Sequence, residues 1–205
     1  MQHGKAHWEE VYSTKPATEV SWFQEHSDVS LGLIQRTGVG KGGTIIDVGG
    51  GASKLVDDLL AQGYSDVTVL DISASALSVA GQRLGARASE VVWLEADITT
   101  VALPYHRFDV WHDRAVFHFL TEADERERYV QAVRHSVKPG GHVIVAAFGP
   151  DGPLHCSGLP VMRYSPDQLH DEFGAPFELV DHTNEAHRTP FGTVQQFIYC
   201  YCRTS

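Results

Sequence analysis

Two glycines and two carboxylates have the spacing of a turn that binds a nucleotide-like cofactor. Residues 44–53 read TIIDVGGGAS, so a short apolar run ends at Asp47 and is followed by Gly49 and Gly51. Glycine allows a sharp turn and lets a ligand approach the backbone without a Cβ in the way. Asp71 closes the next apolar run, where a carboxylate can accept hydrogen bonds from both hydroxyls of a ribose. These residues therefore predict a site for a cofactor that contains a ribose.

The glycines must lie between a strand and a helix for this chemistry to work. Apolar residues at 55, 56, 59 and 60 follow helical spacing, which predicts a helix directly behind the turn. The first N–H groups of such a helix are unpaired and attract an anionic group. A dinucleotide-binding turn would need G-x-G-x-x-G, but Lys54 occupies the position of the third glycine. This departure speaks against a nicotinamide-dependent oxidoreductase.

Residues 47–53 resemble the first motif of the class I S-adenosylmethionine-dependent methyltransferases, in particular those that act on small molecules. That motif is an acid, any residue and then G-x-G-x-G, and Ser53 stands in place of its last glycine. The resemblance covers roughly residues 41–205 and implies that S-adenosyl-L-methionine is the cofactor. It also implies a set of cofactor-binding residues, with the adenine edge at Asp97 and the ring on Ile98: Asp47, Gly49, Gly51, Asp71, Ile72, Asp97 and Ile98.

The catalytic candidates lie where the resemblance puts the end of the fourth strand, in residues 108–113. His112 and Asp113 form the best-placed polar pair there, and His112 also becomes a candidate cofactor contact. An imidazole has a reference pKa near 6.5, about right for accepting a proton at neutral pH. The alternative is that the pair only orients the next helix. His187 is the third catalytic candidate.

Residues 1–40 precede the first strand and are predicted to form an N-terminal helical cap. Trp8, Val11 and Tyr12 share one helical face, and Trp22 follows in residues 16–25. The W-x-x-x-Y arrangement resembles the lid that closes over the cofactor in many small-molecule methyltransferases. It makes Trp8 and Tyr12 candidate cofactor contacts and Trp22 a candidate substrate contact. The alternative is that these rings only bury the N-terminus against the sheet.

Strand and helix patterns alternate through the middle of the chain. Strands are predicted at 44–48, 67–71, 90–94, 108–111 and 142–148, and helices at 73–84 and 121–136, the latter with a Thr121-x-x-Asp124 cap signature. Such βα repeats imply a parallel sheet with helices on both faces. A helix at 165–173 and two strand-like runs, 177–183 and 194–202, follow.

A hairpin at the end of a parallel sheet forces one strand to run antiparallel. The expected fold is therefore α/β, a Rossmann-like doubly wound seven-stranded sheet in the family's order 3-2-1-4-5-7-6, with strand 7 antiparallel. Residues 41–205 would form the catalytic domain, joined to the cap at 1–40 in a single domain overall.

The topology also predicts which side chains meet around the acceptor. Ligands of open α/β sheets bind beyond the carboxyl ends of the parallel strands. The loops 149–164 and 185–192 should both reach that rim, whereas Cys200 and Cys202 should lie at the far end of their strand. The rim supplies candidate substrate contacts, with the arginines suited to an anionic group: His155, Cys156, Arg163 and Arg188.

A metal site is an alternative use of the imidazole and thiol groups that should converge near this rim. They are His112, His118, His155, Cys156 and His187. None of them has a tight ligand spacing such as H-x-x-x-H, so no metal is expected.

Composition excludes several kinds of partner. The 205 residues carry a formal net charge of −10, which argues against nucleic acid because phosphate contacts need clustered Lys and Arg. No apolar stretch of ~18 residues predicts a membrane span. Three cysteines do not make a disulfide framework, so a cytoplasmic protein is expected.

The expected function is methyl transfer from S-adenosylmethionine to a heteroatom of a small polar molecule, by a monomer or homodimer without nucleic acid or membrane partners. Protein lysine is the second acceptor considered. An adenosine-cofactor-binding module without transfer activity is the alternative from a different class, ahead of the nicotinamide enzyme.

Overall fold

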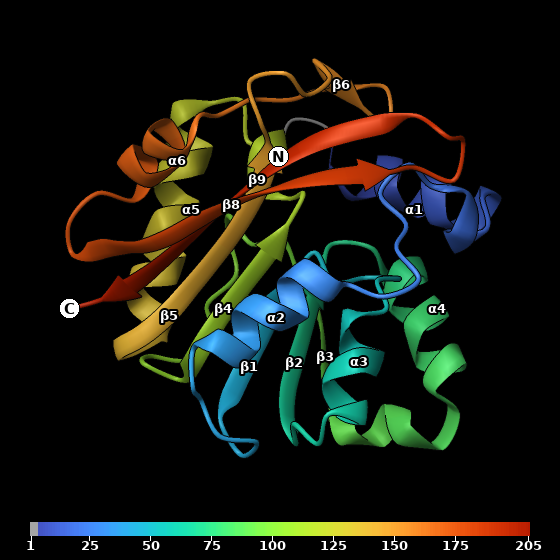
Figure 1. Cartoon of the computed structure of the whole chain (residues 1–205). Coiled ribbons are helices and arrows are strands. Elements are labelled where there is room, and N and C mark those ends of the chain that lie inside the picture. The colour runs from blue at the N-terminus through green and yellow to red at the C-terminus, as the bar shows by residue number, and fades with distance from the viewer. Residues whose placement is uncertain (1–3) are drawn as a thin grey trace.

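The computed structural model describes residues 4–205, so residues 1–3 of the predicted cap lie outside the described residues. A seven-stranded sheet has the order β3-β2-β1-β4-β5-β9-β8 (Figure 1). Five strands pair in parallel: β1 (Thr44–Val48), β2 (Asp66–Asp71), β3 (Val91–Glu95), β4 (Phe108–Arg114) and β5 (Val137–Phe148). β9 (Val194–Thr204) runs antiparallel to both β5 and β8 (Phe177–Arg188). The predicted sheet order, with its reversed last strand, is confirmed.

Helices cover both faces of this sheet. α2 (Asp28–Arg36), α3 (Leu55–Ala61) and α4 (Ala74–Leu84) bury apolar side chains against one face. α5 (Ala123–Ser136) and α6 (Pro166–Phe173) pack on the other. Successive residues of a strand point to opposite faces, so Ile45 belongs to the first core and Ile46 to the second. Strands buried on both sides explain the continuous apolar runs in the sequence.

The predicted start of α5 differs from the structure. The Thr121–Asp124 cap is wrong: the N-cap of α5 is Glu122, which makes no side-chain hydrogen bond. Thr121 instead donates its backbone N–H to Phe119, the last residue of the short helix η3 (Phe117–Phe119). The capping box lies at α6, where Ser165 and Gln168 exchange hydrogen bonds.

The strand β8 is longer than predicted. Polar residues after Thr183 suggested a loop at 185–192, but the ladder continues to the pair Arg188 and Val194. β5 stops earlier, at the pair Phe148 and Phe197, so the tip of the β8–β9 hairpin extends beyond the rest of the sheet. Polar residues alternate along this part of β8 because one side of the overhang faces solvent, and for that reason the sequence suggested a loop.

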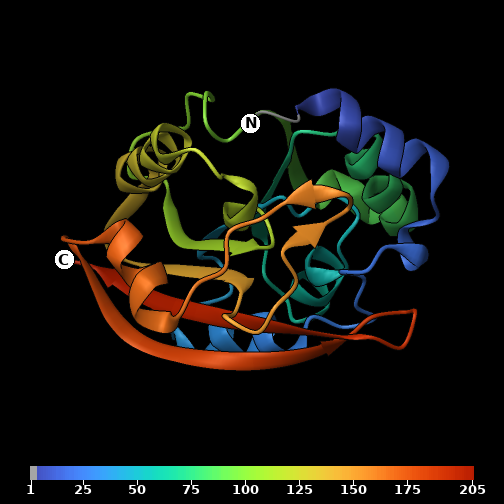
Figure 2. The same cartoon turned by 90° about the horizontal axis from the view of Figure 1, so that it is seen from above.

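The remaining elements gather at the edge where the parallel strands end. They are α1 (Lys5–Thr14), η1 (Ala17–Glu19) and the small hairpin of β6 (His155–Cys156) and β7 (Leu159–Pro160), whereas η2 (Gly85–Glu90) follows α4 elsewhere. In Figure 2, seen from above, the β6–β7 hairpin lies over the middle of the molecule and α1 lies at the upper right. Among the described residues, no helix is both long and apolar enough to cross a membrane.

Candidate active site

A cavity of about 610 Å³ lies beyond the carboxyl ends of β1, β2 and β4. Side chains from the N-terminal cap, the glycine turn, the loops after β2, β3 and β4, and the β6–β7 hairpin form its walls. The lining residues are Trp8, Tyr12, Trp22, Val48, Gly49, Leu70, Asp71, Ile72, Ala96, Ile98, Arg114, Ala115, Val116, Phe119 and Cys156. The fold thus brings together residues that are more than 100 positions apart, as predicted from the strand ends.

The glycine turn leaves no room for side chains. Gly49 and Gly51 have φ of 69° and 27°, in the left-handed region that favours glycine. A Cβ on Gly49 would overlap a methyl group of Val116, and a Cβ on Gly51 would overlap the carboxylate of Asp71. The backbone N–H of Gly49 donates to the carbonyl of Leu70 at 2.7 Å, which fixes the turn against β2.

Asp71 is buried at the end of β2 and faces the cavity. Its carboxylate accepts the backbone N–H of Ser73 at 2.9 Å, next to the start of α4. Burial raises the pKa of Asp71 to about 7, because the charged form loses hydration. Hydroxyl donors from a bound ribose would compensate for that loss, so the position fits its predicted role.

Residues after β2 and β3 form an apolar slot beside Asp71. Ala96, Ile98 and Ile72 contribute side chains to the cavity wall. Asp97 is turned into its own loop, where one carboxylate oxygen accepts the N–H and the hydroxyl of Thr99 at 2.8 and 2.7 Å. Burial opposes its charge, but these hydrogen bonds outweigh it and lower the pKa of Asp97. The slot suits an adenine ring packed on Ile98.

The helix α1 is fastened across the cavity. Glu9 accepts the backbone N–H groups of Ala74 and Ser75, the first residues of α4, at 2.6 and 3.2 Å. A ring nitrogen of His7 lies 3.3 Å from the hydroxyl of Ser157 in the β6–β7 hairpin. The cap and the hairpin therefore close over the same space, which favours the predicted lid role for α1.

Aromatic rings line the part of the cavity beneath this lid. Trp8 meets Trp22 edge to face at 5.8 Å and Phe119 at 5.0 Å, and the indole N–H of Trp22 donates to the hydroxyl of Tyr12 at 3.1 Å. Cys156 completes the wall, and burial raises its pKa to about 11. We call the space bounded by Trp8, Tyr12, Trp22, Phe119 and Cys156 the aromatic chamber.

A second cavity, of about 550 Å³, lies on the other side of the glycine turn. Tyr12, Trp22, Gly49 and Arg114 line both cavities. The remaining walls come from residues 17–27, α2, the glycine turn and the buried end of β4, namely Ala17, Val20, Phe23, Gln24, Ser27, Ser30, Asp47, Gly50, Ala52, Ser53 and His112. An elongated ligand could therefore run from one cavity into the other past Gly49.

Arg114 supplies the positive charge at this junction. Its guanidinium pairs with the carboxylate of Glu185 at 3.2 Å and also donates to the hydroxyl of Tyr199 at 3.0 Å. The carbonyl of Trp22 accepts a further, longer bond at 3.3 Å, and the ring of Phe197 lies 4.2 Å below the cation. Glu185 and Tyr199 were missed in the sequence, because only the register of β8 and β9 brings them to Arg114.

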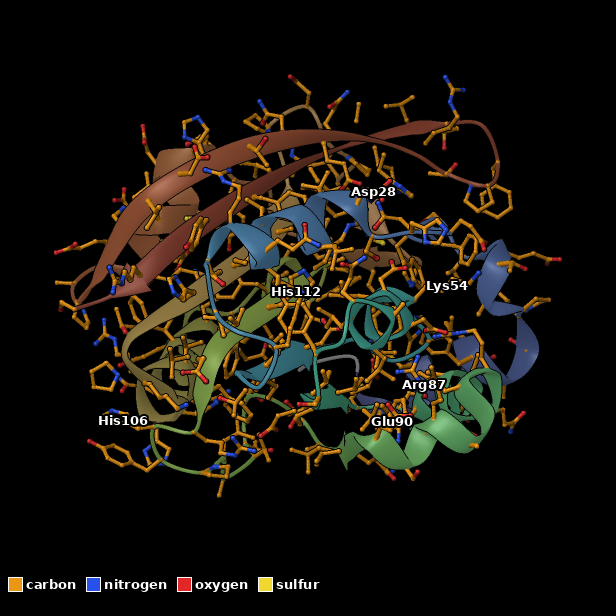
Figure 3. The ribbon with its side chains drawn as sticks, turned by 60° about the horizontal axis from the view of Figure 1, so that its bottom comes forward. Asp28, Lys54, Arg87, Glu90, His106 and His112 are labelled. Carbon is orange, nitrogen blue, oxygen red and sulfur yellow. The ribbon has the colours of Figure 1, made fainter. Side chains whose placement is uncertain are left out.

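His112 is buried, and both of its ring nitrogens are engaged. Nδ1 lies 2.7 Å from the carboxylate of Asp47, and Nε2 lies 2.9 Å from the hydroxyl of Ser30. Figure 3 shows His112 near the centre of the molecule. It lines the second cavity but not the aromatic chamber, so this arrangement suits positioning of Asp47 better than proton transfer from an acceptor.

Asp113 is fully buried and lines neither cavity. It accepts the backbone N–H groups of Val116 and Phe117 at 2.9 and 3.1 Å and the hydroxyl of Tyr129 at 2.6 Å. Burial raises its pKa to about 7. These contacts shape the turn after β4, in line with the orienting role that was the alternative for this pair.

The other rim candidates divide into buried and exposed groups. His187 is buried on β8, and its Nε2–H donates to the carbonyl of Ser21 at 2.7 Å, which holds the segment before Trp22. Burial, together with the charge of Arg114, lowers the pKa of His187. His155 and Arg188 are exposed and line neither cavity, so their contact with a substrate stays a prediction.

Arg163 lies in the loop 149–164, and His118 lies beneath that loop, where its carbonyl accepts the backbone N–H of Met162. Arg163 is exposed and donates to the carbonyls of Pro150 and Gly152 at 2.8 and 3.3 Å, so it fastens its own loop. His118 is fully buried beneath that loop without a hydrogen bond at either ring nitrogen, and burial lowers its pKa to about 3. Within residues 4–205, no three His, Cys, Asp or Glu side chains cluster closely enough to hold a metal ion.

Comparison with known proteins agrees with this geometry. Residues 45–141 match the methyltransferase domain family. Human EEF1A lysine methyltransferase 2 is 21% identical over 192 residues, which is 86% of this chain and 75% of that protein.

Solved structures share the fold at low sequence identity. A protein solved in work on the conversion of a disulfide bond into a thioacetal group during echinomycin biosynthesis has a TM-score of 0.77 and 20% identity, covering 98% of this chain and 92% of its own. The Burkholderia thailandensis 1,6-didemethyltoxoflavin-N1-methyltransferase, solved with S-adenosylhomocysteine, has a TM-score of 0.70 and 19% identity, covering 98% and 84%.

Proposed function

Because this chain belongs to the class I S-adenosylmethionine-dependent methyltransferases, we propose that it transfers a methyl group to a heteroatom of a small polar molecule. The observation that carries the proposal is the aromatic chamber. It is a recess beside the cofactor residues, and side chains of α1 and of the β6–β7 hairpin line it. A recess of this kind suits a ligand that can be enclosed, as small molecules are.

The cofactor is S-adenosylmethionine, and when bound it supplies an electrophilic methyl group on sulfur. Asp71 would accept the ribose hydroxyls, and the slot at Ile98 would hold the adenine. The backbone of Gly49 and the guanidinium of Arg114 would bind the amino-acid end, because a guanidinium pairs well with a carboxylate. The two cavities that join at Gly49 and Arg114 are the space for such an elongated ligand.

The protein's own contribution to the reaction is positioning and exclusion of water. Methyl transfer is an in-line displacement, so its rate depends on holding donor and acceptor in line. Trp8, Trp22 and Phe119 would form walls around the acceptor, with their edge-to-face packing limiting its orientation. The contact of Glu9 with α4 would hold the lid closed over them.

Protein lysine is the second candidate acceptor. It is supported by the activity that the name of the human relative states and by a net charge of −10, which suits a basic target. The roof over the chamber favours the small molecule, because a protein chain needs an open groove in which to lie. Three free thiols, at Cys156, Cys200 and Cys202, support the proposal of a reducing compartment such as the cytoplasm.

The test separates the candidates by where the methyl group goes. We expect the purified protein, given S-adenosylmethionine with a labelled methyl group, to label a compound in a low-mass cell fraction. Label in the protein fraction alone would favour the lysine acceptor. Binding of S-adenosylhomocysteine without transfer to either fraction would favour a cofactor-binding module that has no transfer activity.

A further inference from the structure

The aromatic chamber also restricts the chemistry of the acceptor atom. We infer that the acceptor is an uncharged amine or ring nitrogen that attacks without help from a protein base, an inference that rests on the proposed methyl transfer. Three features support it: the walls of the chamber, the lack of a base among its described residues, and the charge balance of the reaction.

The walls favour a cation at the reacting centre. Trp8, Trp22 and Phe119 all line the chamber, and Trp8 meets each of the other two rings edge to face rather than stacked in parallel. The π faces of aromatic rings attract cations, most strongly when the site is closed to water. The charge of Arg114, the cation beside the chamber, is balanced by Glu185 at 3.2 Å, and its guanidinium lies over the ring of Phe197.

The described residues of the chamber supply no base for neutral pH. Burial raises the pKa of Tyr12 well above that of an ordinary phenol and raises that of Cys156 to about 11, so both keep their protons. Asp71 faces the same cavity, but hydrogen bonds from the ribose would occupy it. His112 is engaged by Asp47 and Ser30, outside the chamber.

The charge balance of a nitrogen acceptor fits these walls. A neutral nitrogen lone pair forms the new N–C bond while the C–S bond breaks and its electron pair stays on sulfur. The positive charge therefore moves from sulfur to nitrogen, and the total charge in the chamber does not change. Any N–H proton of the product is released to water after the chamber opens. Burial also favours the neutral form of an amine before it reacts, because desolvation penalises the ammonium ion.

Oxygen and thiolate acceptors fit less well. A hydroxyl must lose its proton as it reacts, and this step needs a positioned base. A thiolate would bring a negative charge against the π faces, which carry the negative end of the ring quadrupole. These two acceptor classes are therefore the outcomes that would contradict the inference.

A binding experiment tests the charge preference without knowledge of the substrate. The protein is saturated with S-adenosylhomocysteine and titrated with benzyltrimethylammonium or with neopentylbenzene, which has the same shape without the charge. We expect the ammonium probe to bind at least ~fivefold more tightly, which corresponds to about 1 kcal/mol. Equal affinity, or no binding of the ammonium probe to the cofactor-saturated protein, overturns the inference.

Variants locate the preference in the chamber. Trp22→Leu and Phe119→Leu should each reduce the ammonium advantage to less than about twofold, because each removes a π face. The matched control is Trp93→Leu, since Trp93 lies on β3 outside both cavities and donates to the carbonyl of Ala88. A rise in melting temperature with S-adenosylhomocysteine shows that each variant is folded. If both chamber variants still bind the ammonium probe at least ~fivefold more tightly than the neutral probe, the preference does not come from the aromatic chamber.

The transfer experiment then separates this inference from the proposed function. Fragmentation of the labelled product should show the methyl group on nitrogen. A methyl group on oxygen or on a thiol sulfur would overturn the inference and leave the proposed function intact. If no compound is labelled although the cofactor binds, the proposed function itself fails.

Discussion

The Arg114 guanidinium lies 3.2 Å from the Glu185 carboxylate, and this ion pair joins the end of β4 to β8 at the register where β5 ends. Both side chains are about nine-tenths buried, and the hydroxyl of Tyr199 bonds to both. Gln24 donates to the other oxygen of Glu185. The pair therefore fixes the residues 17–27 over the second cavity and orients Arg114 toward both cavities.

Removing one partner of this pair should be costly. We expect Glu185→Ala to lower the free energy of unfolding by about 3 kcal/mol, because it leaves a buried cation without its counter-ion. Urea denaturation measures the change. The matched control is Asp181→Ala on the same strand, whose exposed pair with Arg36 should contribute less than about 1 kcal/mol. Similar losses for the two variants would show that burial does not strengthen the Arg114 pair.

The glycine turn and Asp71 could be predicted from sequence because their relationship is local. Gly51 follows β1 and Asp71 ends β2, so two successive strands and the helix between them are enough to bring these residues into contact. The Arg114 pair could not be predicted in the same way, since it depends on the register in which β8 and β9 pair. The aromatic residues expected in the cap, Trp8, Tyr12 and Trp22, line the chamber, whereas the expected rim residues His155 and Arg188 are exposed outside both cavities. His187 and Arg188 are neighbours on a strand, so one side chain is buried and the other is exposed.

The buried carboxyl of Asp71 should make stability depend on pH. Its pKa rises from an ordinary value near 3.8 to about 7 in the folded protein, so the folded state holds the proton more tightly than the unfolded state. Stability from this group is complete below about pH 4 and is lost as the pH rises to about 7. Without cofactor, Asp71→Asn should therefore gain at least ~1 kcal/mol relative to the parent between pH 4.5 and 7.5.

Urea titrations at the two pH values measure that difference. Asp109→Asn is the control, because hydrogen bonds from Lys138 and Thr44 outweigh burial and lower the pKa of Asp109. That group titrates below the pH window, so its variant should show no relative gain. A relative stability of Asp71→Asn that does not change with pH would contradict the raised pKa.

His112 should matter more for architecture than for proton transfer. His112→Ala leaves the buried carboxylate of Asp47 without this partner and removes one of the two hydrogen bonds of the Ser30 hydroxyl, so we expect a loss of about 2–3 kcal/mol in unfolding free energy. The pH dependence of kcat should keep its shape, since no proton passes through this imidazole. A stable variant whose pH–rate profile has lost a limb would show instead that His112 is a base.

The contact of Glu9 with α4 should control how long the cofactor stays bound. Glu9→Ala removes two hydrogen bonds to the helix N-terminus, so the dissociation rate of S-adenosylhomocysteine should rise at least ~threefold. Stopped-flow tryptophan fluorescence follows that rate. Glu10→Ala is the matched control, because Glu10 is exposed on the same helix. Equal rates for the two variants would show that α1 does not act as a lid.

Methyl transfer to a small molecule is tested by quantifying both products of one reaction. The protein is incubated with S-adenosylmethionine carrying a trideuterated methyl group and with the low-mass fraction of cells, and mass spectrometry counts the products. We expect the labelled small molecule and S-adenosylhomocysteine to form in equal amounts. The variant Asp71→Ala should form neither product. S-adenosylhomocysteine formed without a labelled low-mass compound, or label found only on protein, would contradict methyl transfer to a small molecule.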